Sequence, residues 1–270
     1  MPEPARSTIE PAREVPFRGG GFAPRRIRHL APPFFLLLLL LWEGVSRAGM
    51  VSPLALPPPS AILEALGDLA KSGDLWRHLE ASLYRLVLGW ILGSAAGLLL
   101  GLLIGISSLG RTLGIPLVAA LFPIPKIAML PLFILWFGIG EPSKLATIAL
   151  GSFFPTVINA YAGIDNVPRS LVRMGQSFGL SHRAIVFEIL LPGALPGILA
   201  GARISSSIAL VLLVAAEMIG AQYGIGALVL QAGNLMRTDQ LMAGVVVLSL
   251  LGLTISALIG FAERRLLAWR

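Results

Sequence analysis

The sequence predicts an all-α protein, a polytopic membrane helical bundle with six transmembrane helices. Hydrophobic residues make up 56% of the 270 residues and charged residues only 13%, and the mean hydropathy is +0.83. An ordinary soluble domain carries about twice that share of charge. The apolar residues gather in runs long enough to cross a bilayer as helices, and Lys and Arg gather near the ends of these runs.

Composition also excludes several classes of function. The 21 Lys and Arg residues outnumber the 14 Asp and Glu residues, but their positions near span ends serve orientation, so we expect no nucleic-acid partner. Without cysteine, the chain has no disulfide, no thiolate metal site and no cysteine nucleophile. The three histidines, His29, His78 and His182, are scattered over different sides of the expected membrane. We therefore expect no metal site and no catalytic residue.

The N-terminal part divides into a tail and the start of a membrane domain. Residues 1–24 are rich in proline and glycine and poor in core-forming side chains, which predicts a disordered cytoplasmic tail. Residues 25–270 then form one membrane domain. Three basic residues precede its first span and place the N-terminus in the cytoplasm, namely Arg25, Arg26 and Arg28.

The first span and the segment after it carry local helix signals. On the span, residues 30–48, Glu43 and Arg47 are four residues apart and can pair at its outer end. The chain then lies outside, where Ser60 is placed to cap a helix that runs to Lys71. The apolar face of that helix suits either the membrane surface or the flank of a neighbouring span.

Two spans carry ladders of small residues at intervals of four, the second at residues 81–107 and the fifth at residues 196–220. Such a ladder lets another helix approach closely through most of the membrane depth. Two ladders can support a compact bundle, a dimer contact, or both. The first ladder is Gly89, Gly93, Gly97, Gly101 and Gly105, and the second is Gly193, Gly197, Gly201, Ser205 and Ala209.

The third span, residues 115–139, contains four prolines and Lys126, so a straight helix is excluded. A broken helix with an intramembrane ammonium lines a cavity or a subunit contact, or else the side chain reaches to the nearer interface. Glu217, near the outer end of the fifth span, is the second intramembrane charge. It marks a pathway or gate, unless a structural partner explains it.

The remaining spans are residues 144–163 and 241–262. We expect Glu141 and Lys144 in a tight outer turn before the fourth span. Residues 105–112 resemble a phosphate-binding loop superficially, but no strand precedes them and the lysine is missing. The sequence therefore predicts a short cytoplasmic turn there, and no nucleotide site.

The longest polar interruption among the later spans is a cytoplasmic loop at residues 164–196. Its apolar and polar residues alternate as in two short amphipathic helices that break at Gly179. Gly179 permits the positive φ that a chain reversal needs, and Ser181 can then cap the second helix. The pattern therefore predicts an ordered loop.

The spacing in this loop resembles the cytoplasmic signature of ABC importer permeases: Glu-Ala-Ala, three residues, Gly, nine residues, Ile-x-Leu-Pro. The later part matches, but Arg173, Met174 and Gly175 stand where Glu-Ala-Ala would be. In that family the first short helix docks into a cleft of a separate ATPase subunit. The resemblance implies that the residues coupling this chain to an ATPase are Arg173, Gly175, Phe178, Gly179, Ser181, Ile189, Leu191 and Pro192.

The resemblance covers about residues 75–270, and further segments look like the branch that serves aliphatic sulfonates, taurine and nitrate. These segments are His78 with Ser82 and Arg85, residues 122–126, residues 136–141 and residues 216–220. The resemblance implies a type I ABC importer permease fold, with residues 25–270 as the transmembrane permease domain and residues 164–196 as its coupling loop. It also implies the bacterial cytoplasmic (inner) membrane, with both termini in the cytoplasm.

The partners implied are a second permease subunit forming a homodimer, two ABC ATPase subunits, an extracytoplasmic substrate-binding protein and the lipid membrane. This chain would bind no cofactor and would be no enzyme, since the ATPase subunit uses the ATP. Lys126 and Glu217 would line the solute pathway or its gate. The alternative is an ion-gradient-driven secondary transporter or channel, for which only Glu43 and Glu217 are candidate ion-exchanging carboxylates.

Overall fold

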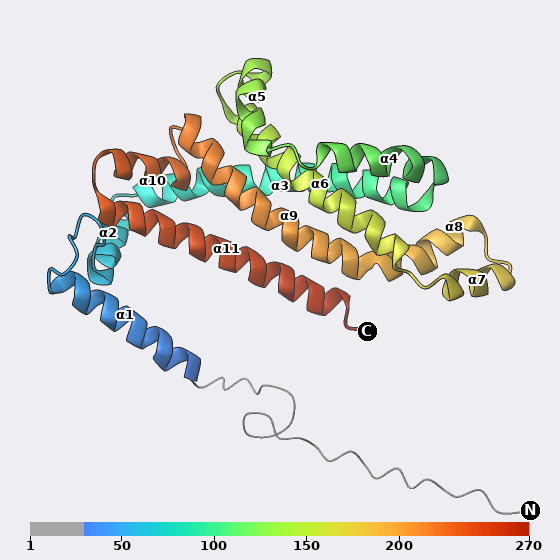
Figure 1. The fold of residues 1–270 in the computed structure, drawn as a ribbon, viewed down its shortest axis with the longest axis horizontal. Coiled ribbons are helices and arrows are strands. Elements are labelled where there is room, and N and C mark those ends of the chain that lie inside the picture. The colour runs from blue at the N-terminus through green and yellow to red at the C-terminus, as the bar shows by residue number, and fades with distance from the viewer. Residues whose placement is uncertain (1–29, 270) are drawn as a thin grey trace, which may run out of the picture.

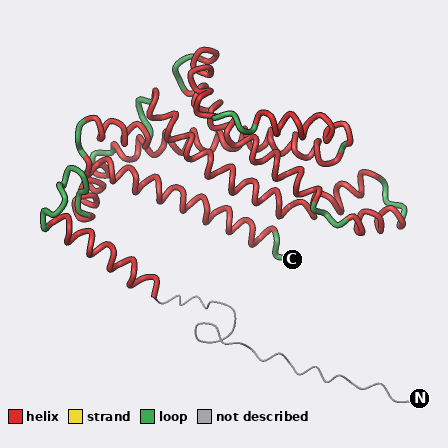
Figure 2. The backbone as a smooth tube through the Cα atoms, viewed as in Figure 1, coloured by secondary structure: helices red, strands yellow, loops and turns green. Residues whose placement is uncertain are grey.

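The computed structural model describes residues 30–269, and this part of the chain is helical, with no β-strand (Figure 2). The expected disordered tail at residues 1–24 lies outside the described residues. The helices, in chain order, are α1 (Ala31–Arg47), α2 (Pro59–Lys71), α3 (Asp74–Ile106), α4 (Ser108–Leu121), the 3-10 helix η2 (Lys126–Met129), α5 (Leu130–Phe137), α6 (Glu141–Asp165), α7 (Arg169–Ser177), α8 (His182–Ala184), the π-helix η3 (Ile185–Leu190), α9 (Leu191–Gly220), α10 (Ile225–Asn234) and α11 (Thr238–Leu266).

Four long helices, α3, α6, α9 and α11, form the body of the bundle (Figure 1). α6 lies between α3 and α9 and is the most buried of the four. Leu86 of α3, Ile148 of α6, Leu213 of α9 and Leu251 of α11 meet in one core cluster. The all-α prediction is therefore confirmed, with α6 as the central helix.

One end of the bundle is covered by α2 and α10, and we call it the α2/α10 end (Figure 1). Ile62 and Leu69 of α2 pack with Ile225 of α10 and Val247 of α11 in a second core cluster. The apolar face of α2 therefore lies on the flank of the bundle, which decides between the two positions that its sequence allowed.

Helix α1 diverges from the bundle and is held mainly at its last turns (Figure 1). The predicted pair between Glu43 and Arg47 is confirmed, with 2.5 Å between Oε1 and Nε. The prediction that Ser60 caps α2 is wrong, because Pro58 is at the N-cap and Ser60 Oγ donates to Glu43 Oε1 at 2.7 Å. An ionised carboxylate is the stronger acceptor, so the serine joins α2 to α1.

The third span is broken, as its prolines predict. Helix α4 ends at Leu121, and the η2–α5 segment leaves it at an angle of 87°. Pro123 and Pro125 lie in the break, where they remove backbone donors and stop the helix. In Figure 1, α5 points away from the body of the bundle.

The expected number of six spans is not confirmed. Within residues 30–269, four helical segments are long and apolar enough to cross a membrane, and the bent pair α4 with η2–α5 would make a fifth. Helix α1 has 17 residues. It therefore rises about 26 Å, less than the roughly 30 Å of a hydrocarbon core.

Candidate functional site

The segment from α7 to η3 forms the end of the bundle opposite to α2 and α10, and we call it the α7/α8 end (Figure 1). Helix α7 ends at Ser177, and Gly179 then takes φ = +76°, in the left-handed region that favours glycine. Ser181 Oγ accepts from the Ala184 backbone N–H at 3.2 Å and caps α8. The structure thus places Gly179 and Ser181 as the sequence predicts, in a helix–turn–helix.

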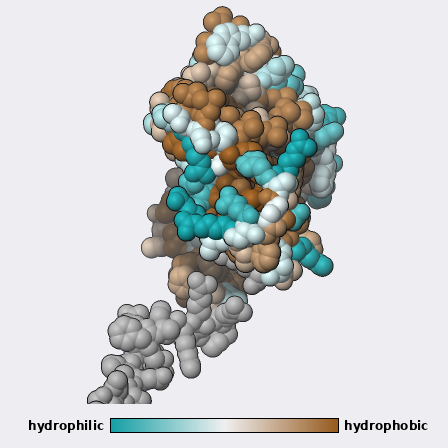
Figure 3. All heavy atoms as spheres, turned by 90° about the vertical axis from the view of Figure 1, so that its right-hand side faces the viewer, coloured by the Kyte–Doolittle hydropathy of each residue, from teal (hydrophilic) through white to brown (hydrophobic). Residues whose placement is uncertain are grey.

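One side of α7 packs against η3, in the second arm of this turn, and the other side of α7 is exposed. A β-carbon built on Gly175 would lie 2.8 Å from Ile189 Cδ1, so the glycine lets α7 rest against η3. Arg173 is exposed, and Phe178 is 79% exposed. Figure 3 looks onto this end, where hydrophilic side chains gather beside a hydrophobic patch. Exposed aromatic and arginine side chains such as Phe178 and Arg173 are enriched at protein interfaces.

The second arm of the turn continues into α9 as one helical segment of 39 residues, His182–Gly220. Its π-helical part, Ile185–Leu190, comes immediately before Leu191 and Pro192. Because Pro192 has no N–H, the Glu188 carbonyl one turn earlier has no α-helical donor, and the π-helical hydrogen-bonding pattern accommodates this. The α7/α8 end is therefore connected to a bundle helix without an intervening loop.

Glycines of both ladders pack against α6. On α3, a β-carbon built on Gly93 would lie 2.1 Å from Ala149 O, and one on Gly97 would lie 2.5 Å from Phe153 O. On α9, one built on Gly197 would lie 2.8 Å from the Gly163 Cα atom. The same close approach to α6 holds for Gly89, Gly101, Gly105 and Gly201. Both ladders thus serve the compact bundle within one chain.

The Lys126 side chain makes hydrogen bonds to the backbone at the break in the third span. Its Nζ donates to the backbone carbonyls of Leu121, Phe122 and Ile124, at 3.4 Å and 2.8 Å for the first and last. The helix ends at this break because Pro123 and Pro125 cannot donate hydrogen bonds, and carbonyls at its C-terminal end accept from the ammonium. Nζ also lies 4.7 Å from the centroid of the Phe154 ring. The half-buried charge is therefore held by the backbone.

A cavity of about 430 Å³ adjoins this lysine, between the break, α6 and α9. Lys126 is the one charged group among the residues that line it. The other lining residues are Phe122, Ile127, Gly151, Pro155, Ser207, Ile208, Val211 and Leu212. An apolar cavity with one cation at its edge fits a small solute that has an anionic head and an apolar body.

Glu217 lies in a buried ionic cluster at the α2/α10 end and is 1% exposed. Its carboxylate accepts from Arg85 Nη1 at 2.8 Å, from the Gly226 backbone N–H at 2.9 Å and from Ser82 Oγ at 2.8 Å and 2.9 Å. Both carboxylate oxygens therefore have hydrogen-bond donors inside the bundle. Arg85 is therefore a structural partner of Glu217, one of the two explanations that the sequence left open for this charge.

Arg85 extends the cluster to α6 and to the turn after α9. Its Nε and Nη2 donate to the two carboxylate oxygens of Glu141 at 2.6 Å and 2.7 Å, and Nη1 also donates to Tyr223 O at 2.6 Å. His78 Nδ1 lies 3.0 Å from the Gly224 backbone nitrogen, which donates to it. One guanidinium therefore joins α3, α6, α9 and the α9–α10 turn.

Sequence reasoning singled out the members of this cluster separately but did not place them together. Arg85 and Glu217 are 132 residues apart, and neither spacing nor periodicity relates them. Glu141 and Lys144 were expected in an outer turn, whereas α6 already begins at Glu141, and Lys144 is 5% exposed inside the bundle. The available signal was indirect: His78, Ser82 and Arg85, with residues 136–141 and 216–220, carried the resemblance to one branch.

The fold is that of a polytopic membrane protein, with an apolar cavity beside Lys126 and an exposed helix–turn–helix at one end. The chain belongs to the family described as binding-protein-dependent transport system inner membrane components, whose family model matches residues 93–268. It is accordingly a permease subunit of the ABC importer type.

Known relatives cover most of the chain. It is 36% identical to the putative aliphatic sulfonates transport permease protein SsuC of Bacillus subtilis over 87% of this chain and 85% of the relative. It is 37% identical to the taurine transport system permease protein TauC of Escherichia coli over 86% of each chain.

A solved structure shows the same fold. A chain of the methionine ABC transporter MetNI in an inward-facing conformation matches with a TM-score of 0.63 and 22% identity, over 73% of this chain and 98% of that one. The fold is thus that of a type I ABC importer permease.

Proposed function

We propose that this chain is the membrane subunit of an ATP-driven importer for small aliphatic sulfonates or taurine. The names of its relatives SsuC and TauC support this solute class. The description of the family supports a binding protein that delivers the solute. Neither relative names nitrate, and we leave it out of the proposal. The chain would act as a homodimer with two separate ATPase subunits, which bind and hydrolyse the ATP.

One observation carries the coupling role, the helix–turn–helix at the α7/α8 end. Helix α7 presents an exposed apolar and basic face, and the turn leads through η3 directly into α9. A displacement of α7 would therefore move α9, which packs on α6 and reaches the opposite end of the bundle. ATP-driven closure of the ATPase subunits would then rock α9 and alter the pathway beside the dimer partner.

The basic residues support an orientation with the α7/α8 end in the cytoplasm. Exposed arginines gather at that end, where Lys and Arg are favoured on the inner side. They are Arg169, Arg173, Arg183, Arg264 and Arg265. Helix α11 also runs toward this end, which would leave the C-terminus in the cytoplasm (Figure 1). The α2/α10 end would then be the outer one, facing the binding protein.

Lys126 and Glu217 take different parts in this proposal. Lys126 lines the intramembrane cavity and would attract the anionic head of the solute. Glu217, through Arg85, ties α9 to α3 at the proposed outer end and would act as part of the gate there. A secondary transporter would need carboxylates free to exchange ions. Glu217 has all its donors in place, and Glu43 already pairs with Arg47 and Ser60.

Replacing Gly179 by Val is expected to uncouple the transporter. A β-branched residue disfavours φ = +76°, with a strain of about 1–3 kcal/mol if the turn is kept. A β-carbon at this position meets no atom within 4 Å, so the effect is purely conformational. Insertion and dimerisation should persist, while ATPase copurification or solute uptake per ATP hydrolysed should fall. The assay is the reconstituted complex in liposomes.

Gly73→Val is the matched control. Gly73 has φ = +84° and equally open surroundings, but it lies between α2 and α3, far along the chain from the docking segment. It should carry a similar strain and leave coupling intact. Wild-type copurification, ATP turnover and uptake in Gly179→Val would refute the coupling role of this turn.

Lys126→Met is expected to lower solute uptake by about tenfold, the worth of one lost contact to a charged group. Lys126→Arg should retain part of the uptake, since the positive charge remains beside the cavity. The carbonyls that Lys126 binds are at a helix end, where a cation is worth up to about 2 kcal/mol, so folded complex should still be recovered. Uptake per folded transporter is the measurement, and wild-type uptake in Lys126→Met would remove the lysine from the pathway.

A further inference from the structure

The ionic cluster at the α2/α10 end contains one fixed carboxylate and one exchangeable carboxylate. Glu217 is enclosed and accepts from Arg85, Ser82 and Gly226. Glu141, whose side chain is 45% exposed, accepts two hydrogen bonds from Arg85 and lies near Lys144, and its carboxylate has no other partner among the described residues. A half-exposed carboxylate regains water when it leaves, so displacing Glu141 costs less than displacing the enclosed Glu217. Glu141 can therefore be displaced while Glu217 stays.

The edge of the Arg85 guanidinium that carries Nε and Nη2 forms a fork and can bind any head group with two acceptor oxygens. Nε and Nη2 hold the two oxygens of Glu141 side by side, at 2.6 Å and 2.7 Å. A sulfonate offers the same pair of oxygens to a guanidinium, as carboxylates and phosphates do. Arg85 is 4% exposed, so this edge is pre-positioned by the bundle. The geometry shown by Glu141 is thus that of a bound anion.

Lys144 provides a second cation with unused hydrogen-bonding capacity. The residue is 5% exposed, and its Nζ lies 3.7 Å from Glu141 Oε1, beyond hydrogen-bonding distance. An ammonium has three donors and gains from an acceptor that comes closer. The two cations face the two carboxylates Glu141 and Glu217. If Glu141 leaves, one positive charge remains unbalanced, and a monoanion restores neutrality.

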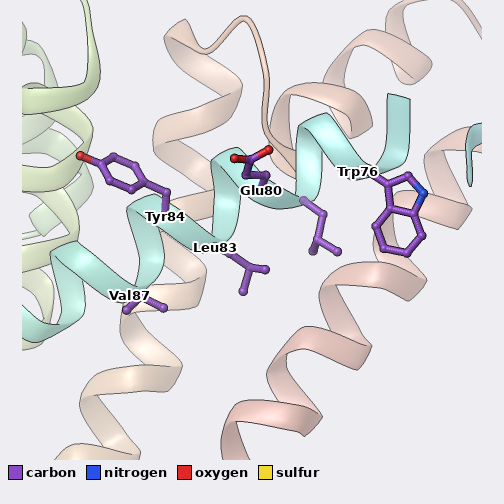
Figure 4. Close-up of a pocket in the computed structure, with 6 residues that line it drawn as sticks. Trp76, Glu80, Leu83, Tyr84 and Val87 are labelled. Carbon is purple, nitrogen blue, oxygen red and sulfur yellow. The ribbon is translucent and has the colours of Figure 1, made fainter. Parts of the chain in front are cut away.

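A cavity of about 520 Å³ gives access to this fork from outside the bundle. It is lined by Arg85 and Glu141, together with Arg77, Glu80, Tyr84 and Tyr223. A neighbouring apolar groove shares Glu80 and Tyr84, which project from α3 near Leu83 and Val87 (Figure 4). An entering solute can thus reach Arg85 without first crossing the bundle.

We propose that Arg85 and Lys144 form an anion-exchange site at the proposed outer end, where the head group of a monoanionic sulfonate replaces the Glu141 carboxylate on the guanidinium fork. This site deepens the proposed function and rests on it. Arg85 joins α3 to α6 through Glu141, and to α9 through Glu217. Exchange therefore releases the start of α6 from α3, while the pair with Glu217 remains closed. Binding of the solute would therefore break the Arg85–Glu141 ion pair and leave the Arg85–Glu217 ion pair intact.

The test measures binding of methanesulfonate to the permease in complex with its ATPase subunits, without the binding protein and against chloride at equal ionic strength. Glu141→Gln removes the competing carboxylate and should tighten methanesulfonate binding by about tenfold or more, the fold-change that corresponds to one contact between charged, hydrogen-bonded groups. Arg85→Lys keeps a charge but loses the fork, and binding should be lost. Equal affinity in the wild type and in Glu141→Gln would overturn the exchange.

A second measurement needs no substitution in the cluster. The chain has no cysteine, so Ala81→Cys introduces a single thiol beside the cavity. Methanesulfonate should slow its alkylation, and chloride should not; equal rates in both salts would overturn the site. Uptake of sulfonate by the complete wild-type transporter is measured in parallel. Uptake without protection would refute the exchange site alone, whereas no sulfonate uptake at all would refute the proposed solute class as well.

Discussion

Gly97→Leu is expected to hold α3 and α6 apart and to destabilise the folded permease by about 3 kcal/mol, the upper range for overpacking. A β-carbon at this position would lie 2.5 Å from Phe153 O, which is backbone and cannot turn away as a side chain does. In lipid, close approach of helices supplies much of the energy of association. Yield of folded protein in detergent and its thermal stability are the measurements.

Gly67→Leu is the control for this substitution. Gly67 is also within a helix, but a β-carbon there meets no atom within 4 Å. The same chemical change should therefore leave yield and thermal stability close to those of the wild type. Unchanged values for Gly97→Leu itself would show that the ladder does not form the contact with α6 described above.

Arg85→Met is expected to cost about 3–5 kcal/mol, because it leaves the Glu217 carboxylate buried without its cation. Glu217 is 1% exposed, so water cannot replace the guanidinium. The double variant Arg85→Met/Glu217→Gln removes the uncompensated charge and keeps an acceptor for Ser82 and Gly226. It should recover most of the lost stability, measured by thermal unfolding of the purified protein. A double variant as unstable as Arg85→Met would contradict the role assigned to the pair.

Local features of the fold could be predicted from the sequence because each depends on residues near one another along the chain. Glycines four residues apart lie on one helix face, so the ladder of α3 predicted a close helix contact. Prolines at 123 and 125 predicted the break after α4. The turn at Gly179 with its cap at Ser181 followed from the same local chemistry. The sequence did not say which helix each ladder meets.

The cluster around Glu217 could not be predicted, because it brings together residues more than 130 positions apart. Its carboxylate was weighed as a pathway group or a paired group, and only the structure supplies Arg85 as the partner. The proline break did carry a usable signal, because Pro123 and Pro125 cannot donate the hydrogen bonds that helical carbonyls accept. Orphaned carbonyls at a proline break call for a nearby cation, and Lys126 is the next residue.

Uptake of a radiolabelled alkanesulfonate into liposomes tests the central claim most directly, namely that this permease is driven by a separate ATPase. The complete transporter is reconstituted with its binding protein and ATP, in parallel with the permease alone under an imposed proton or sodium gradient. We expect uptake only when the ATPase subunits and hydrolysable ATP are both present. Gradient-driven uptake by the permease alone would contradict the account and identify a secondary transporter.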